Sequence, residues 1–307
     1  MRFAVLFCVF LCFLQADTLF ENLKNQIDFA KKQYLLYQDD LDFKNLDPKD
    51  IIPEPIKPKS PEVQKPSNAK NLPKLLIIMD DIKSLKQFNS LQKIGLNITP
   101  SIFPKTPASP KTPEITKHTK EYMIHLPLEA LNFPQKELEP LSIGMSYEEI
   151  LARLKTIKAQ FPNLKYLNNH TGSKFTSSYE DMKVLLNVLD ELNLRFIDSV
   201  TTPNTALTRI AKEQKRLIMQ RDIFLDNRVS EESIILQIEL AIAKAKKKGY
   251  AIAICHPRPS TYKALSKMKN KLSKEVELVS PQELESYLIK RKINLYARSK
   301  FHHAQEN

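Results

Sequence analysis

Apolar runs alternate with amphipathic stretches from about Lys74 onward. Leu75–Met79 is an uninterrupted apolar run, which is typical of a strand buried on both faces. Apolar residues then recur at helical spacing from Ile82 to Ile94, and Gly95 follows where a helix commonly ends. Further runs that predict strands are Leu96–Ile102, Tyr122–Leu126, Leu164–Leu167, Leu194–Ile197, Leu217–Met219, Tyr250–Ile254 and Val276–Val279.

Helix signals fill most of the gaps between these runs. Ser146 and Glu149 have the spacing of a capping box, and Ser280 precedes a proline at the first position of another predicted helix. Strands that alternate with helices over about 220 residues predict parallel strands joined by crossovers. We therefore expect an α/β fold of about seven parallel strands, arranged as an open sheet or a barrel.

The first 73 residues follow a different pattern. Residues 1–16 contain one arginine, an apolar run from Phe3 to Leu14 and a small Ala16, which is typical of a signal peptide. The run is shorter than the roughly 20 residues of a membrane-spanning helix. Because Leu14 is bulky for a cleavage site, a retained membrane anchor is the alternative; otherwise no membrane span is expected.

Residues 17–73 predict a linker that is first charged and then rich in proline, with seven prolines between positions 48 and 73. Proline at this density breaks helices and favours an extended chain. The folded domain is therefore expected at residues 74–290, and residues 291–307 form a basic C-terminal tail.

The composition narrows the class of protein. With 307 residues, 42% of them hydrophobic, the chain can form a large core and is not wholly disordered. Of its three cysteines, Cys8 and Cys12 lie in the signal segment, so a disulfide framework is excluded. Cys255 alone would remain after cleavage, which suits an oxidising compartment. The net charge of +12 fits a nucleic-acid partner, an acidic polymer or only a lysine-rich proteome. The export signal favours the periplasm or cell envelope and no nucleic-acid partner. The oligomeric state stays open.

Polar side chains gather at the carboxyl ends of the predicted strands. In parallel α/β folds these ends share one face, on which active sites are built. Each group alone has an ordinary explanation, because an Asp after a strand often caps a helix and a single His is often only hydrogen-bonded. Six such strand ends together favour a functional site; they carry Asp80 and Asp81, His125, Asn168 to His170, Asp198 and Ser199, Arg221 and Asp222, and His256.

One carboxylate with two imidazoles is a donor set suited to zinc or a similar divalent cation. Three protein ligands would leave a position for water, whose pKa a zinc ion lowers to about 7. The adjacent Asp80 and Asp81 allow a division of labour, since successive side chains at a strand end diverge. One could bind the cation while the other takes a proton from water, and a histidine across the site could protonate a leaving amine.

The motifs IIMDD, HLP, NNHTGS, RDIFLD and ICHP, in this order, resemble those of the divergent polysaccharide deacetylases, relatives of the NodB-type carbohydrate esterases. The resemblance runs from Lys74 to about Leu288. It implies a distorted (β/α) barrel, export, and metal-dependent removal of N-acetyl groups from peptidoglycan or a related polysaccharide. Members of the family usually carry methionine where Thr171 stands and glycine where Cys255 stands, and Cys255 could narrow the pocket.

The resemblance also implies roles for single residues. Asp81 and His125 match metal ligands, Asp80 the catalytic base and His256 the general acid. The superfamily's second metal histidine comes four residues after the first, where this chain has Glu129. We therefore expect His170 as the third ligand, with Glu129 as the alternative.

Supporting roles fall to a further set of residues. Arg221 is expected to orient Asp80, and Asp198 or Asp222 to hold a histidine in place. Asn169 and Ser173, from the NNHTGS motif, are expected to support the site or contact substrate.

Two other functions fit the same residues. One is a non-catalytic cell-wall binding or scaffold protein on a deacetylase fold, with a basic surface for anionic polymer. The weaker one is a metal phosphoesterase, which would share the ligands but cleave phosphate esters.

Overall fold

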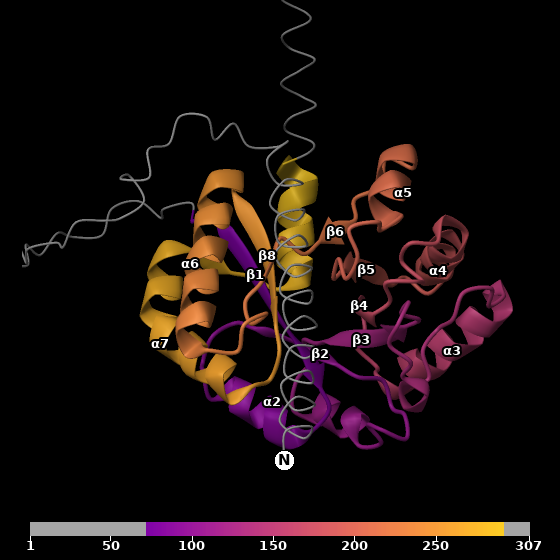
Figure 1. Ribbon diagram of the computed structural model, residues 1–307, viewed down its shortest axis with the longest axis horizontal. Coiled ribbons are helices and arrows are strands. Elements are labelled where there is room, and N and C mark those ends of the chain that lie inside the picture. The colour runs from indigo at the N-terminus through magenta and orange to yellow at the C-terminus, as the bar shows by residue number, and fades with distance from the viewer. Residues whose placement is uncertain (1–71, 292–307) are drawn as a thin grey trace, which may run out of the picture. The chain divides into compact units, whose positions relative to one another are not determined.

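The computed structural model describes residues 72–291 (Figure 1). The expected signal peptide, all but the last two residues of the linker, and all but the first residue of the basic tail lie outside the described residues. Every strand pair in the described part is parallel, and the helices lie between successive strands, which confirms the α/β class. The strands are β1 (Lys74–Ile82), β2 (Thr99–Ile102), β3 (Met123–Leu128), β4 (Tyr166–Thr171), β5 (Arg195–Asp198), β6 (Met219–Gln220), β7 (Ile223–Phe224), β8 (Tyr250–Cys255) and β9 (Glu277–Leu278).

The order of the strands shows that the sheet curls into an incomplete barrel. It runs β6-β5-β4-β3-β2-β1-β8-β7, with β9 beside the start of β1. The outermost strands, β6 and β7, are separated by only two residues in the sequence. Three Cα steps of 3.8 Å keep Gln220 and Ile223 within about 11 Å of each other. The two edges of the sheet must therefore approach each other, as expected of a distorted barrel.

Helices surround the outside of the curved sheet (Figure 1). Helices α6 and α7 pack on each other, and α6 also packs on β8, while α4 packs on β5. The helices are α2 (Leu85–Gln92), α3 (Tyr147–Gln160), α4 (Tyr179–Glu191), α5 (Leu207–Glu213), α6 (Glu231–Lys248) and α7 (Pro259–Glu275), with the 3-10 turns η2 (Thr112–Lys117) and η3 (Lys136–Leu138) and a last helix at 281–291. Within the described part of the chain, no helix is both long and apolar enough to cross a bilayer.

Alternate residues of β1 enter two separate hydrophobic clusters. Leu75, Ile77 and Met79 belong to the cluster that includes most of the outer helices, whereas Leu76 and Ile78 belong to a smaller one. Because both faces of the strand are buried, its sequence is uninterruptedly apolar.

The helix at 281–291 closes the amino-terminal end of the barrel. Its residues Leu284 and Leu288 join the smaller cluster. Its polar side chains contact residues at the starts of strands, as in the 2.6 Å hydrogen bond from the Tyr166 hydroxyl to Glu285. With this end closed, access to the interior is left to the carboxyl ends of the strands.

Two helix starts agree with the sequence, whereas nine strands form in the described residues where about seven were expected, and several strand bounds differ from the predicted runs. Ser146 and Glu149 form the expected capping box, and the first turn after Ser280 is capped in the same way by Glu283. Strand β4 runs further than expected, so that Asn168, Asn169 and His170 lie within it rather than in a loop. Strand β7 was not predicted, because two residues are too few to give a pattern.

Candidate metal centre and active site

A break in β1 turns both of its carboxylates toward one site. The pairing of β1 with β2 shifts register between Met79 and Ile82, and Asp81 has a φ of 58°. A non-glycine residue in this left-handed region is uncommon, and bulges near active sites often redirect a side chain. One of the two carboxylates was expected to bind the cation while its neighbour reached the bound water. Asp81 Oδ1 lies 3.2 Å from His125 Nε2, and Asp80 Oδ1 lies 3.6 Å from Nδ1 of the same ring.

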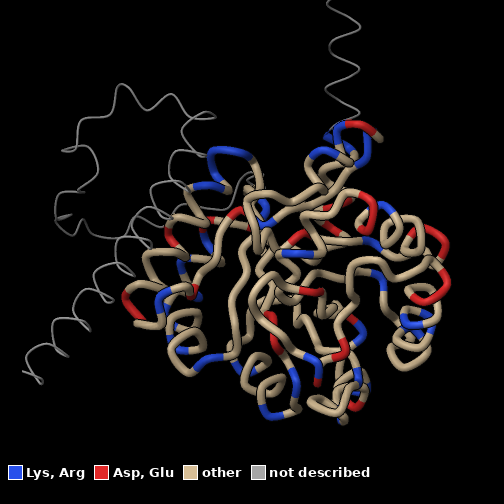
Figure 2. Tube along the Cα trace, turned by 45° about the vertical axis from the view of Figure 1, so that its right-hand side comes forward, with Lys and Arg blue, Asp and Glu red and all other residues tan. Residues whose placement is uncertain are grey.

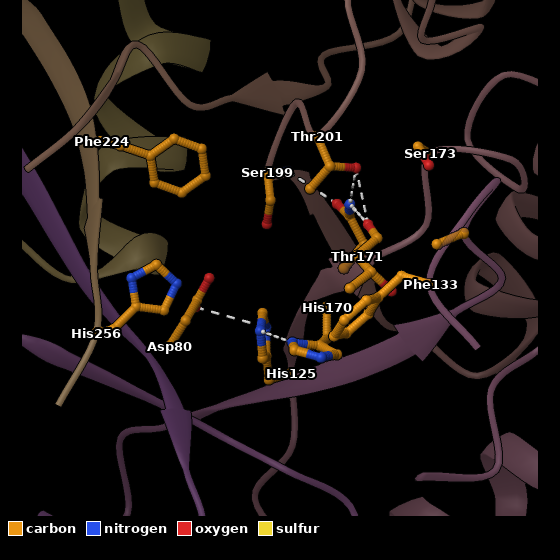
Figure 3. A pocket seen from close by; sticks show the side chains of 12 residues that line it. Asp80, His125, Phe133, His170, Thr171, Ser173, Ser199, Thr201, Phe224 and His256 are labelled. Atoms are coloured by element: carbon orange, nitrogen blue, oxygen red, sulfur yellow. Dashed lines mark hydrogen bonds and ion pairs between the residues drawn. The ribbon is translucent and has the colours of Figure 1, made fainter. Parts of the chain in front are cut away.

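Asp81, His125 and His170 bring three ligand atoms together. Asp81 Oδ1 is 3.1 Å from His170 Nδ1, and His170 Nδ1 is 3.0 Å from His125 Nε2. Figure 3 shows the two rings side by side near Asp80. We call Asp81, His125 and His170 the ligand cluster, since each offers a ligand atom close to the other two.

The ligand cluster fits a divalent cation. Ligands bound at 2.0–2.1 Å in tetrahedral zinc sites lie about 3.3 Å apart, close to the spacing found here. Asp81 Oδ1, one of the three ligand atoms, is buried without a hydrogen-bond partner, which is uncommon for a buried polar atom and accords with a site built for an ion.

Asn168 fixes the state of His125. Its Nδ2 donates to Asp80 Oδ1 at 2.8 Å, and a carboxylate only accepts, so the amide nitrogen must face Asp80. The amide oxygen therefore faces Ser101 Oγ at 2.6 Å and His125 Nδ1 at 3.2 Å. Nδ1 of His125 must then carry the hydrogen, which leaves Nε2 as a donor atom for a cation.

Burial and charge set the protonation of these groups. Burial raises the pKa of Asp80, which makes it a stronger base than an exposed carboxylate. Burial also acts to raise the pKa of Asp81, but contacts with the two histidines outweigh it and lower that pKa. Burial lowers the pKa of His170. Burial acts in the same direction on His125, but the nearby carboxylates of Asp80 and Asp81 outweigh it and raise its pKa.

His256 is held by Asp226, a residue that the sequence analysis did not single out. The Nδ1 of His256 lies 2.9 Å from Asp226 Oδ1, and Asp226 Oδ2 accepts from the His256 backbone N–H and from Thr261. Burial acts to lower the pKa of His256, but Asp226 outweighs it and raises that pKa. Burial acts to raise the pKa of Asp226, and His256 lowers it instead. Because of this pair, the His256 imidazole stays protonated at pH values above those at which a histidine usually loses its proton.

A pocket of about 330 Å³ lies against Asp80, the two histidines of the ligand cluster and His256. Figure 3 shows His256 and Phe224 on one side and His170 and Phe133 on the other. The pocket is lined by Asp80, His125, Ala130, Phe133, Asn169, His170, Thr171, Ser173, Ser199, Thr201, Phe224 and His256. Cys255, expected as a residue that could narrow the pocket, is fully buried and directs its thiol to the Ile78 carbonyl.

Arg221 has contacts other than the one expected with Asp80. Its Nε donates to the Ser199 carbonyl at 2.7 Å and its Nη2 to the Val200 carbonyl at 2.9 Å. Its guanidinium lies 3.7 Å from the centre of the Phe224 ring. Arg221 thus ties the end of β5 to one wall of the pocket, and Asn168 is the residue that orients Asp80.

The two other expected carboxylates also act elsewhere. Asp198 accepts from Val200 N and Thr205 Oγ1 in the turn after β5. Asp222 accepts from Lys248 and from the backbone of Ile252. Both are engaged with loops or neighbouring strands, so the role of holding a histidine falls to Asp226.

Asn169 and Ser173 line the pocket, as expected, and also hold its edges in place. Asn169 Oδ1 accepts from Ser199 N at 2.8 Å, and Ser173 Oγ accepts from Leu131 N at 3.1 Å. Glu129, the alternative third ligand, is bound instead to Lys174 and to the backbone N–H of Ile143.

Comparison with known proteins gives the family. The model of the divergent polysaccharide deacetylases matches residues 77–284, so the chain belongs to this family. It is 32% identical over 214 residues to the uncharacterized protein YibQ of Escherichia coli K12, covering 69% of this chain and 67% of that protein. An uncharacterized protein of Haemophilus influenzae is 33% identical over 208 residues, covering 67% of this chain and 74% of that protein. The crystal structure of the uncharacterized protein ATU2773 from Agrobacterium tumefaciens has a TM-score of 0.62 at 17% identity, over 71% of this chain and 92% of that one, and shares the fold.

Proposed function

We propose that this divergent polysaccharide deacetylase is an exported, metal-dependent N-deacetylase acting on peptidoglycan or a related polysaccharide of the cell envelope. The observation that carries the proposal is the ligand cluster, whose three ligand atoms lie 3.0–3.2 Å apart. Its two histidines line a pocket together with the buried carboxylate of Asp80 and the paired imidazole of His256. The signal-peptide pattern of residues 1–16 supports the proposed export and the location in the periplasm or envelope.

Asp81, His125 and His170 would hold the cation, for which zinc is the best match to one oxygen and two nitrogen donors. A bound divalent cation would polarise the acetamide carbonyl and make water more acidic. The protein contributes the tautomer of His125, which Asn168 fixes, and a buried setting in which charges act strongly.

Asp80 and His256 complete the reaction as base and acid. Asp80 contacts Asn168 and His125 through Oδ1, which leaves Oδ2 to take a proton from the attacking water. The water oxygen bonds to the acetyl carbon, the carbon–nitrogen bond breaks, and the protonated His256 gives its proton to the departing amine. The products are acetate and a free amino sugar.

The walls of the pocket suit an N-acetylated sugar. Asn169, Ser199 and Thr201 supply polar groups, while Phe133 and Phe224 supply apolar ring faces. A sugar ring with an acetamide group presents both kinds of surface, which a site with few polar groups among apolar ones can recognise.

Asp80→Asn tests the base. The variant should bind zinc as the wild type does and release less than about 1% of the acetate from N-acetylglucosamine oligosaccharides or peptidoglycan fragments, because general base catalysis contributes about 100- to 10,000-fold. Asp190→Asn is the matched control and should keep full activity, because Asp190 lies on α4 and forms an ion pair with Arg216 at the surface. Acetate release by Asp80→Asn at the wild-type rate would contradict the assignment.

His170→Ala tests the ligand cluster. The variant should lose both zinc and activity, measured by metal analysis after dialysis and by acetate release. Glu129→Gln, at the position of the alternative ligand, should keep its zinc. Unchanged zinc in the His170→Ala protein, or loss of zinc in the Glu129→Gln protein, would refute the assignment.

A scaffold that only binds anionic wall polymer is less well supported. Several lysines of α6 and α7 are in ion pairs, among them Lys246 with Glu275 and Lys271 with Glu239. Figure 2 shows basic and acidic positions interspersed over the outer helices. A scaffold predicts that the wild type binds glycan and releases no acetate.

A further inference from the structure

A second hollow adjoins the pocket and shares a wall with it. It has a volume of about 540 Å³, and Ala130, Phe133 and Thr171 line both spaces. We call it the side groove; its other lining residues are Leu128, Glu129, Leu131, Asn132, Pro134, Gln135, Lys136, Pro140 and Ser142. Because the groove and the pocket have three residues in common, one extended ligand could occupy both.

We propose, on the basis of the proposed function, that the side groove binds a second sugar unit of the glycan chain, with the Phe133 ring placed between the two units. The Phe133 side chain is 59% exposed and that of Leu131 is 64% exposed, although few large apolar side chains of the described residues are so open. An exposed aromatic ring beside a catalytic pocket offers a flat apolar surface that a sugar ring can cover.

The charge and polarity of the groove favour a neutral sugar over an anionic polymer. Glu129 and Lys136 are the charged residues that line it, and Glu129 is paired with Lys174, so no cluster of cations is present there. Asn132 and Gln135 bring side-chain amides, and the Gln135 side chain makes no capping hydrogen bond to the 3-10 turn η3 that follows it. Side-chain amides next to an apolar ring can bond the hydroxyls at the edge of a sugar whose face the ring covers.

The loop that carries Phe133 is anchored close to the ligand cluster. Leu131 N donates to Ser173 Oγ, and the Glu129 carbonyl accepts from Lys174 N and Phe175 N, just after β4. At its other end, Leu141 N donates to the Pro127 carbonyl in β3. The strands that carry His125 and His170 therefore also position the groove, so the distance between the two sugar sites is fixed by the fold.

The test measures binding rather than turnover. Zinc-loaded Asp80→Asn protein is titrated calorimetrically with β-1,4-linked N-acetylglucosamine of one, two and four units. The affinity is expected to rise about tenfold from one sugar unit to two, because the second unit would cover one face of the Phe133 ring and remove it from water. Adding Phe133→Ala or Leu131→Ala should reduce the gain, and Phe133→Trp should preserve it. Leu236→Ala, which removes an exposed leucine on α6, should leave the gain unchanged.

Each outcome separates this inference from the proposed function. Length-dependent binding without acetate release by the wild type would support the groove and refute the deacetylase. Acetate release that is equally fast on one and four units, or a gain that survives in the Phe133→Ala and Leu131→Ala proteins, would overturn the groove alone. Absence of binding to any of these sugars overturns it as well. Self-association that Phe133→Ala abolishes would make the groove an interface between copies of the chain and also overturn the proposal.

Discussion

Asp226→Asn should change the acid of the reaction while leaving its shape in place. In the wild type, the His256 backbone N–H and the Thr261 hydroxyl both donate to Asp226 Oδ2, and His256 Nδ1 donates to Oδ1. An asparagine can satisfy the first two donors only if its oxygen takes the Oδ2 position. The NH₂ group of the asparagine then faces His256 Nδ1 and donates to it. Because Nδ1 can accept only when it carries no hydrogen, the neutral imidazole is favoured.

The magnitude follows from the geometry of this pair. Asp226 is fully buried and its Oδ1 is 2.9 Å from Nδ1, so solvent screens the attraction little. Two unit charges about 4 Å apart at an effective dielectric of 20 attract by about 4 kcal/mol, a factor of about 1000 in the ratio of protonated to neutral imidazole. The ratio should fall by up to this factor when the charge is removed.

The sign of the pH dependence is then fixed. Asp226 raises the pKa of His256. The imidazole is therefore fully protonated at pH values below the usual pKa of a histidine, and it loses its proton only as the pH rises through the raised pKa. In Asp226→Asn the fall in activity should begin at a lower pH, and activity at neutral pH should drop while zinc content stays constant. The assay is acetate release from peptidoglycan fragments between pH 5 and pH 9.

Asp222→Asn is the matched control, because this carboxylate accepts from Lys248 and Ile252 N. It should leave the descending limb of the pH–rate profile in place. If the limb also stays in place in Asp226→Asn, His256 is not the acid.

Three further predictions concern metal affinity and stability. Asn168→Leu should weaken zinc binding by about 10- to 100-fold in competition with a chelating dye, since it removes the partner of His125 Nδ1; unchanged affinity would refute that role. Gly172→Ala should cost about 1–3 kcal/mol in urea unfolding, because Gly172 has a φ of 92° and an added Cβ would lie 2.8 Å from Leu128 Cβ. Gly144→Ala, with a φ of 79° and nothing within 4 Å, is its control and should cost less. Chelation of zinc present at about 100 times its Kd should lower the melting temperature by about 5–10 °C, and His170→Ala should show no such change.

The fold could be predicted from the sequence because its strands are buried on both faces. Leu75–Met79 and Tyr250–Ile254 are apolar without a break, and both belong to strands that pair with a neighbour on each side. Strands at the edge gave a weaker signal, since β6 and β7 pair on one side only and have two residues each.

The supporting residues of the site could not be predicted in the same way. Asp226 is the last residue of RDIFLD, a motif recognised in the sequence, yet nothing in the pattern separates it from Asp222 four residues earlier. The difference is spatial, because Asp226 meets His256 at the end of β8 whereas Asp222 meets the backbone of β8 at Ile252. Asn168 is a similar case, since a neutral amide gives no sign of its partners until the strands are aligned.

The choice between Glu129 and His170 as third ligand depends on the register of β3 and β4. His125 is level with Asn168 in this parallel pair, and Pro127 is level with His170. Side chains two residues apart on a strand share a face, so His170 lies on the same face as Asn168. It is two residues further along the strand than the level of His125. A neighbouring strand thus supplies the imidazole that a histidine four residues after His125 would have supplied. A slip of one residue would turn His170 to the opposite face, and the ligand cluster would lose one of its nitrogens.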